Sequence, residues 1–186
     1  NRTPLREKVP VHWRTMVTTA DPTLRTRTNP SQKMKVVINV CYGGFSLSPQ
    51  AVAAIAKRKG RPCYFFKSSL SGGDRFTRIE MPNDSDFMWS AFDIENPNEI
   101  LDQSDFHTWT MEQRQASNAL YRKHEHETRP SNRSDADLVA VVEELGELAF
   151  GSCAKLKVVE IPDHTEYEVE EYDGMEHVAE VHRTWA

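Results

Sequence analysis

The stretch that most constrains the fold is residues 34–60, MKVVINVCYGGFSLSPQAVAAIAKRKG. Met34 to Cys41 is an apolar run rich in β-branched residues, which is the composition of a buried strand. Ser48 is a favourable N-cap, Pro49 suits the first helical turn, and apolar residues follow at helical spacing as far as Gly60. The stretch therefore predicts a strand, a glycine-containing loop and a helix.

Short apolar segments continue the pattern after this helix. Residues 62–67, PCYFFK, predict a second strand that would complete a β–α–β unit with parallel strands. Residues 75–81 alternate and predict a short strand, whereas residues 110–126 contain neither Gly nor Pro and predict a helix. The region between the better-defined segments is polar, so residues 68–133 are interpreted as an insert.

The C-terminal third contains a second helix followed by strands. Ser134 is expected to cap a helix that Gly151 ends. Its expected buried stripe consists of Leu138, Val141, Val142, Leu145 and Leu148. Residues 154–161 predict a strand, and residues 167–181 predict a hairpin on an Asp-Gly turn. The predicted fold is a single α+β domain with a mixed sheet of about five strands, two β–α–β segments and a C-terminal β-hairpin.

Residues 1–33 differ in character from the domain predicted over residues 34–186. The segment has four prolines, many threonines and little apolar periodicity, so it is expected to be an extended N-terminal arm. It carries seven Arg and Lys against two acidic residues, a net charge of +5, whereas the rest of the chain carries −10. Its composition is also typical of what remains after an organelle-targeting peptide is trimmed. An initial Asn fits such processing, and equally fits further residues before it.

Composition argues against several classes of protein. No stretch approaches the roughly 20 apolar residues that span a bilayer. Residues 34–186 carry a net negative charge, and phosphate binding needs a positive surface. We therefore expect no DNA partner and do not favour an RNA partner. Cys41, Cys63 and Cys153 lie far apart without a CxxC pair, and they are interpreted as buried, reduced thiols in an intracellular, reducing compartment.

The glycine loop after the first strand is the candidate ligand site. Backbone N–H groups at glycines, with a helix N-terminus beside them, favour an anion. The loop matches neither GxGxxG nor GxxxxGK[ST], however, and tight strand–helix packing is the favoured explanation of its glycines. If a ligand does bind, the candidate residues are Gly43, Gly44, Ser46 and Ser48, completed by His182 and Arg183 near the C-terminus.

Other clusters of polar residues give weaker indications. His124 and His126 lack HExxH spacing and would point about 200° apart on a helix, so they predict no shared metal. Nine acidic residues, and no Lys or Arg, lie between Lys157 and Arg183. Alternation on the hairpin favours a solvated acidic face, then a docking surface for a basic partner, and lastly catalysis. No catalytic set, metal or cofactor is predicted.

Four blocks of the sequence carry a resemblance to a known family. They are VVINVCYGGFSLS (36–48), DLVAVVEELGE (137–147), AKLKVVEIPD (154–163) and EYDGMEHVAEVHRTW (171–185). Together they resemble a family of small uncharacterised proteins of phages and bacteria, over about residues 34–70 and 133–185. That family has no assigned activity, so the resemblance implies only a shared framework comprising Gly43, Gly44, Phe45, Tyr172, Asp173, Gly174, His182, Arg183 and Trp185.

These observations lead to three functional hypotheses. The first is a non-catalytic accessory subunit of a large multiprotein assembly, of the mitochondrial respiratory-chain or ATP-synthase type on the matrix side, reaching a membrane only through its partners. Its arm would dock on other protein subunits through Val11, Trp13 and Met16, with Arg25 and Arg27 contributing less because exposed charges are screened. The alternatives are a small enzyme or nucleotide- or phosphate-binding domain that uses the 42–48 glycine loop and the C-terminal HRTW, and a protein associated with organellar ribosomes.

Overall fold

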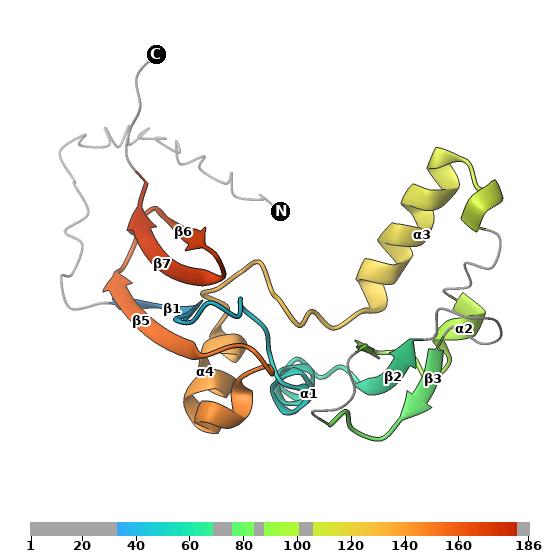
Figure 1. Cartoon of the computed structure of the whole chain (residues 1–186), viewed down its shortest axis with the longest axis horizontal. Helices are drawn as coiled ribbons and strands as arrows, with labels where there is room; N and C mark the ends of the chain where they lie inside the picture. The colour runs from blue at the N-terminus through green and yellow to red at the C-terminus, as the bar shows by residue number, and fades with distance from the viewer. Residues whose placement is uncertain (1–32, 69–75, 84–87, 101–105, 182–186) are drawn as a thin grey trace, which may run out of the picture.

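The computed structural model describes residues 33–68, 76–83, 88–100 and 106–181 (Figure 1). Within them lie seven strands, four α-helices and two short 3-10 helices. In chain order they are β1 Lys33–Asn39, α1 Pro49–Arg58, β2 Tyr64–Ser68, β3 Phe76–Ile79, β4 Trp89–Phe92, α2 Pro97–Ile100, η1 Phe106–Thr108, α3 Met111–His124, α4 Ala136–Leu145, η2 Gly146–Ala149, β5 Leu156–Pro162, β6 Tyr167–Tyr172 and β7 Met175–Glu180. The predicted α+β class is confirmed, and residues 1–32 of the predicted arm lie outside the described residues.

The strands form three small antiparallel sheets rather than one mixed sheet. β1 pairs with β5, β2 lies between β3 and β4, and β6 pairs with β7. The predicted parallel β–α–β pairing is therefore wrong, because β1 and β2 belong to different sheets and α1 connects them. Hydrophobic periodicity identifies a strand but does not specify its neighbour, which is set by packing between distant segments.

Figure 1 shows how these sheets are arranged around the two central helices. The β1–β5 pair and the β6–β7 hairpin lie on one side, α1 and α4 pack together, and the β3-β2-β4 sheet lies on the other side with α3 projecting from it. No helix among the described residues is long and apolar enough to cross a membrane.

The apolar core has two parts, of which the larger also includes Phe65 and Ala91 of the three-stranded sheet and so connects the two sides. The main cluster joins β1, α1 and α4, and includes Val37, Leu47, Val52, Leu138 and Val141. A smaller aromatic cluster lies between the three-stranded sheet and α3, where Phe66, Phe76 and Phe92 pack with Leu120 and Tyr121. The rings of Phe92 and Tyr121 meet edge to face, with centroids 5.2 Å apart.

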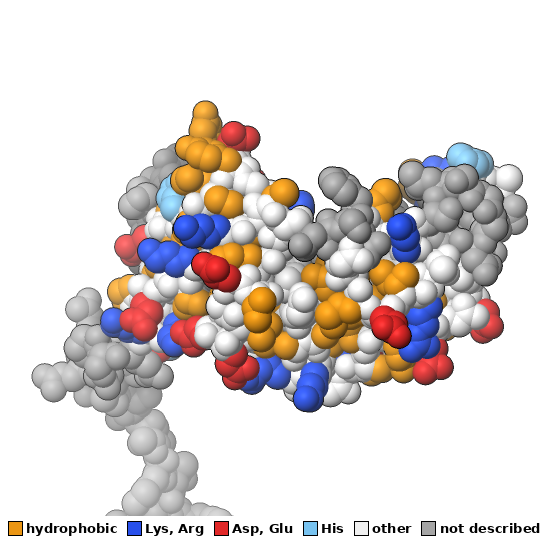
Figure 2. Space-filling view, turned by 60° about the horizontal axis from the view of Figure 1, so that its bottom comes forward, with side chains coloured by type: hydrophobic (Ala, Val, Ile, Leu, Met, Phe, Trp, Pro, Cys, Tyr) orange, Lys and Arg blue, Asp and Glu red, His pale blue; other side chains and the backbone are white. Residues whose placement is uncertain are grey.

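The face that α1 and α4 present to solvent carries charges of both signs, as Figure 2 shows. Arg58–Glu144 and Lys59–Asp135 join the two helices, and Lys35–Glu143 joins β1 to α4. Their members are substantially exposed, so each pair contributes little to stability.

The ends of the helices test the predicted capping residues. Ser48 caps α1 as predicted, and its Oγ accepts the Ala51 N–H at 3.1 Å. The predicted cap of α4 is wrong by one residue, because Asp135 Oδ1 accepts the backbone N–H groups of residues 137 and 138. The Ser134 hydroxyl donates instead to Asn132 Oδ1.

The C-terminal end of α4 also differs from the prediction. The helix ends at Leu145 because Gly146 adopts a φ of +56°, and a short 3-10 helix follows. The buried stripe is confirmed at Leu138, Val141 and Val142, but Leu148 is 66% exposed. The change of direction at the glycine turns this leucine out of the core.

The hairpin follows its prediction closely. The residues of its Asp-Gly turn have positive φ, with 50° at Asp173 and 86° at Gly174, as a two-residue hairpin turn of this type requires. Glu168 and Glu170 are exposed whereas Tyr167 is partly buried, which confirms one solvated acidic face.

Candidate functional site

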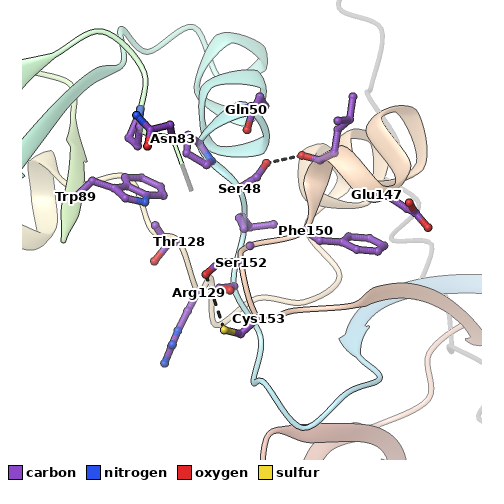
Figure 3. Close-up of a pocket in the computed structure, with 16 residues that line it drawn as sticks. Ser48, Gln50, Asn83, Trp89, Thr128, Arg129, Glu147, Phe150, Ser152 and Cys153 are labelled. Carbon is purple, nitrogen blue, oxygen red and sulfur yellow. Dashed lines mark hydrogen bonds between the residues drawn. The ribbon is translucent and has the colours of Figure 1, made fainter. Parts of the chain in front are cut away.

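A cavity of about 770 Å³ lies where the two sides of the fold meet (Figure 3). Its walls come from residues 46–50 before and within α1, residues 82–83 after β3, Trp89 of β4, residues 128–129 and the loop around residues 147–153. The volume falls in the range of sites that hold small molecules or short peptide segments. This first cavity is the principal candidate site.

Backbone hydrogen bonds between distant segments build the wall of the first cavity. Leu47 and Phe150 form an isolated antiparallel bridge. The Leu47 N–H donates to the Thr128 carbonyl at 2.9 Å, and the Ser48 N–H donates to the Ala149 carbonyl at 3.0 Å. Residues 47–48, 128 and 149–150 are far apart in the chain, and these bonds fix the three segments to one another.

Large apolar side chains line the first cavity. Trp89 lies at one side of the view in Figure 3, with Phe150 and Glu147 at the other. The Trp89 ring packs edge-on against Phe65, with centroids 5.6 Å apart, so its position is fixed by the core. Leu148 completes the apolar lining and is largely exposed.

The polar groups of the first cavity are mostly neutral. Gln50, Asn83 and Ser152 are exposed and bring amides and a hydroxyl, and the charged side chains are Arg129 and Glu147. The Ser48 hydroxyl is committed to the fold, because it caps α1 and donates to the Leu148 carbonyl at 2.5 Å. The lining therefore offers donors and acceptors for a neutral ligand together with apolar contacts.

The predicted ligand residues are divided by the structure. Ser46 and Ser48 line the first cavity, whereas Gly43 and Gly44 do not. A Cβ at Gly43 would lie 1.6 Å from the Cys153 carbonyl oxygen, so close packing of two loops requires a glycine there. This supports the packing explanation of the glycines, and ligand binding by the loop stays a prediction.

The remaining predicted site residues cannot be placed. The C-terminal pair His182 and Arg183 lies outside the described residues, as do the predicted partner-binding residues Val11, Trp13, Met16, Arg25 and Arg27.

A second cavity of about 540 Å³ separates residues 129–133 from the β6–β7 hairpin. One wall contains a buried ion pair in which Arg133 Nη2 lies 2.9 Å from Glu176 Oε1. Glu176 Oε2 accepts the Asn39 N–H at 2.8 Å, and the Arg133 guanidinium lies 3.4 Å from the centroid of the Phe45 ring. Burial lowers the pKa of Arg133 despite the nearby Glu176. The ion pair joins the hairpin to the main core.

Sequence reasoning missed this ion pair. Glu176 was grouped with the solvated acids, yet it is 8% exposed. The available signal was the hairpin register, because residues 176 and 178 share the face that carries Tyr167 and Val169.

Asn39 is a second buried polar residue that the sequence did not single out. Its Nδ2 donates to the carbonyls of Cys41 and Gly174, each at 2.6 Å, and its Oδ1 accepts the Lys155 N–H at 2.8 Å. Its side chain thereby fastens the end of β1 to the start of β5 and to the hairpin turn.

His124 and His126 have separate structural partners. His124 Nδ1 lies 2.8 Å from Asp93 Oδ1, and Arg61 Nη2 lies 2.8 Å from Asp93 Oδ2. His126 Nε2 lies 2.8 Å from the Pro62 carbonyl oxygen. Among the described residues, no group of three His, Cys, Asp or Glu is placed to hold a metal ion.

The three cysteines are free thiols, but their burial differs from the prediction. Cys153 is exposed at the first cavity, whereas Cys41 and Cys63 are partly buried. Burial raises the pKa of Cys63 to about 11. Cys153 is the most exposed of the three, and it lies in the loop between η2 and β5.

Arg129 lines both cavities, so the two sites are neighbours on one side of the molecule. Their chemistry differs, since the first combines apolar and neutral polar groups while the second is bordered by two arginines and two glutamates.

Neither a protein-family model, nor a curated protein, nor a solved structure matches this chain.

Proposed function

We propose that the chain is a non-catalytic binding subunit of a multiprotein assembly that docks an extended segment of a partner protein in the first cavity. The observation that carries the proposal is the 66% exposure of Leu148 on a cavity that Trp89 and Phe150 also line. Large apolar side chains that gather at an open cavity are typical of an interaction site. The docked segment would insert at least one large apolar side chain among them.

The polar lining favours a peptide over a charged small molecule. A peptide backbone alternates N–H donors with C=O acceptors, and the side-chain amide of Gln50 offers both kinds of group. One positive and one negative side chain, Arg129 and Glu147, leave the lining without net charge. A neutral, extended backbone with apolar side chains is the ligand that this combination suits best.

The commitment of Ser48 favours binding over catalysis. Its hydroxyl both accepts from the Ala51 N–H and donates to the Leu148 carbonyl. A serine nucleophile needs a general base in hydrogen-bond contact with its hydroxyl, and here that position is taken by a backbone carbonyl.

The N-terminal arm supplies a second proposed contact with the assembly. Trp13 and its apolar neighbours would anchor the arm, and the arm's composition is the basis for proposing an organellar location.

Selection of peptides on the full-length protein tests the proposal. A phage library of random peptides is selected on the immobilised protein, and the enriched peptides are synthesised. Their Kd is measured by fluorescence anisotropy for the wild type, Leu148→Glu and Met111→Glu. Met111 is the matched control because it is 69% exposed on α3.

The expected result is an enriched consensus with a large apolar residue, whose affinity falls at least about tenfold in Leu148→Glu and is unchanged in Met111→Glu. A selection without consensus, or equal affinities for the two variants, would overturn the proposal. A nucleotide panel tested by thermal melting distinguishes the alternative, since a bound nucleotide raises Tm.

A further inference from the structure

The second cavity has hydrogen-bond donors that the fold leaves unused. Arg129, and the hydroxyls of Ser131 and Tyr167, have no hydrogen-bond or ion-pair partner among the described residues. Arg133 Nη1 is buried and also lacks a hydrogen-bond partner there. A buried donor without an acceptor destabilises the fold, because it has lost its hydrogen bonds to water. A ligand that supplies an acceptor removes this penalty, which favours binding.

Both carboxylate oxygens of Glu176, and one of Glu171, are already engaged on the same cavity. Glu176 binds Arg133 and the Asn39 N–H through its two carboxylate oxygens. Glu171 Oε1 accepts the Gly174 N–H at 2.6 Å, and its side chain is exposed. Among the described residues, the cavity therefore presents unpaired donors beside carboxylates that are mostly engaged, with Glu171 Oε2 as the exception.

The two arginines also interact unfavourably with each other. Burial is the main cause that lowers the pKa of Arg133, and the positive charge of Arg129 lowers it further. An anion held by both guanidinium groups would relieve this repulsion. Arginine is well suited to that role because its planar group binds two oxygens at once.

We propose that the second cavity is a binding site for the oxyanion of a small molecule, a phosphate or a carboxylate. Arg129 and Ser131 donate to the oxyanion, and a small rotation of the Arg133 side chain brings Nη1 into contact with it. The Tyr167 ring and Val169 contact the rest of the molecule. This site shares Arg129 with the first cavity, but it does not rest on the docking proposal.

Titration of the full-length protein with simple anions tests the inference. The ¹H–¹⁵N spectrum is recorded with increasing sodium phosphate, and separately with sodium acetate, at an ionic strength held constant with sodium chloride. We expect saturable shifts of the amides of residues 131–133 with at least one anion. Saturation by phosphate assigns the phosphate class, and saturation by acetate assigns the carboxylate class.

Four variants make the result specific. Arg129→Gln is expected to weaken binding about tenfold, and Glu171→Gln to tighten it about two- to fivefold by removing a negative charge. Arg122→Gln removes an equal charge from α3 and serves as the control, while Leu148→Glu leaves anion binding unchanged. Because Arg129 is exposed, its variant is expected to keep the wild-type spectrum elsewhere.

Two results would overturn the inference. One is a linear, non-saturating shift with both anions, which indicates ionic strength alone. The other is an equal Kd for the wild type and Arg129→Gln.

Discussion

Arg133 and Glu176 form an ion pair, 2.9 Å between Nη2 and Oε1, that joins the loop before α4 to strand β7. Only 15% and 7% of the two side chains are exposed. The pair, rather than a continuous sheet, holds the acidic hairpin against the main core, together with the Asn39 N–H that Glu176 accepts.

Replacement of Glu176 tests this connection. Glu176→Gln keeps the shape of the side chain but leaves the Arg133 charge buried without its partner, so it is expected to lower the free energy of unfolding by about 3 kcal/mol. Urea denaturation measures the change. Glu168→Gln, on the exposed face of the same hairpin, is expected to change it by less than about 0.5 kcal/mol. Similar losses in both variants would show that the pair does not hold the hairpin.

Substitution of Gly43 separates packing from ligand binding. Gly43→Ala would place a Cβ 1.6 Å from the Cys153 carbonyl oxygen, and is expected to destabilise the fold by at least about 2 kcal/mol. Gly60→Ala is the control, because a Cβ at residue 60 would meet no atom within 4 Å. Its φ of +65° is unfavourable for alanine, so this variant is expected to lower the free energy of unfolding by about 1 kcal/mol. Urea midpoints compare the two, and a harmless Gly43→Ala would contradict the packing explanation.

The environment of His126 leads us to expect that the free energy of unfolding decreases in mild acid. Burial lowers the pKa of its imidazole below the ordinary 6.5, with Arg61 adding to the effect and the Pro62 carbonyl and Asp93 opposing it. The unfolded chain therefore takes up a proton at a higher pH than the folded protein. Stability is expected to fall as pH drops from about 6.5 towards the lower folded pKa.

The matching variant isolates this contribution. His126→Gln keeps a donor for the Pro62 carbonyl but does not titrate, so the difference in unfolding free energy between wild type and variant should change between pH 7 and 5. Asp93, which lies near His126, does not interfere with this measurement. Burial opposes ionisation of Asp93, but the hydrogen bonds from Arg61 and His124 outweigh it and lower the pKa. The contribution of Asp93 to the free energy of unfolding is therefore lost only below about pH 4. A constant difference across the range would refute the assignment to His126.

The cysteines are expected to differ in reactivity. With a pKa of about 11, about one Cys63 side chain in a thousand is a thiolate at pH 8, and its burial limits access further. Cys153 is exposed, so iodoacetamide is expected to modify it first in a time course followed by mass spectrometry. Denaturation in urea should bring the two rates together; faster labelling of Cys63 in the folded protein would contradict its environment.

The local elements were predictable because their signals lie within a few consecutive residues. Ser48 and Pro49 start α1, and the Asp-Gly pair forms the hairpin turn, as expected. Which strands pair was not predictable in the same way. β1 and β5 are joined in a register that begins with Lys33 opposite Pro162, a relationship that depends on packing across the whole chain.

The candidate site was predicted only in part for the same reason. Ser46 and Ser48 were identified from their loop, and both line the first cavity. Trp89 lies in the polar insert, where no pattern singles it out, and the helical period predicted for α4 includes Leu148 in the buried stripe. The positive φ of Gly146 breaks that period and places Leu148 at the cavity.

The most direct test of the docking proposal locates a selected peptide on the protein. The ¹H–¹⁵N spectrum of the full-length chain is recorded with and without the peptide, with the Trp89 indole N–H assigned by comparison with Trp89→Phe. The account predicts that the largest shifts fall on this indole and on the amides of Ser46, Thr128 and Ser152 around the first cavity. Shifts confined to α3 or to the β6–β7 hairpin, with the Trp89 indole unmoved, would contradict it.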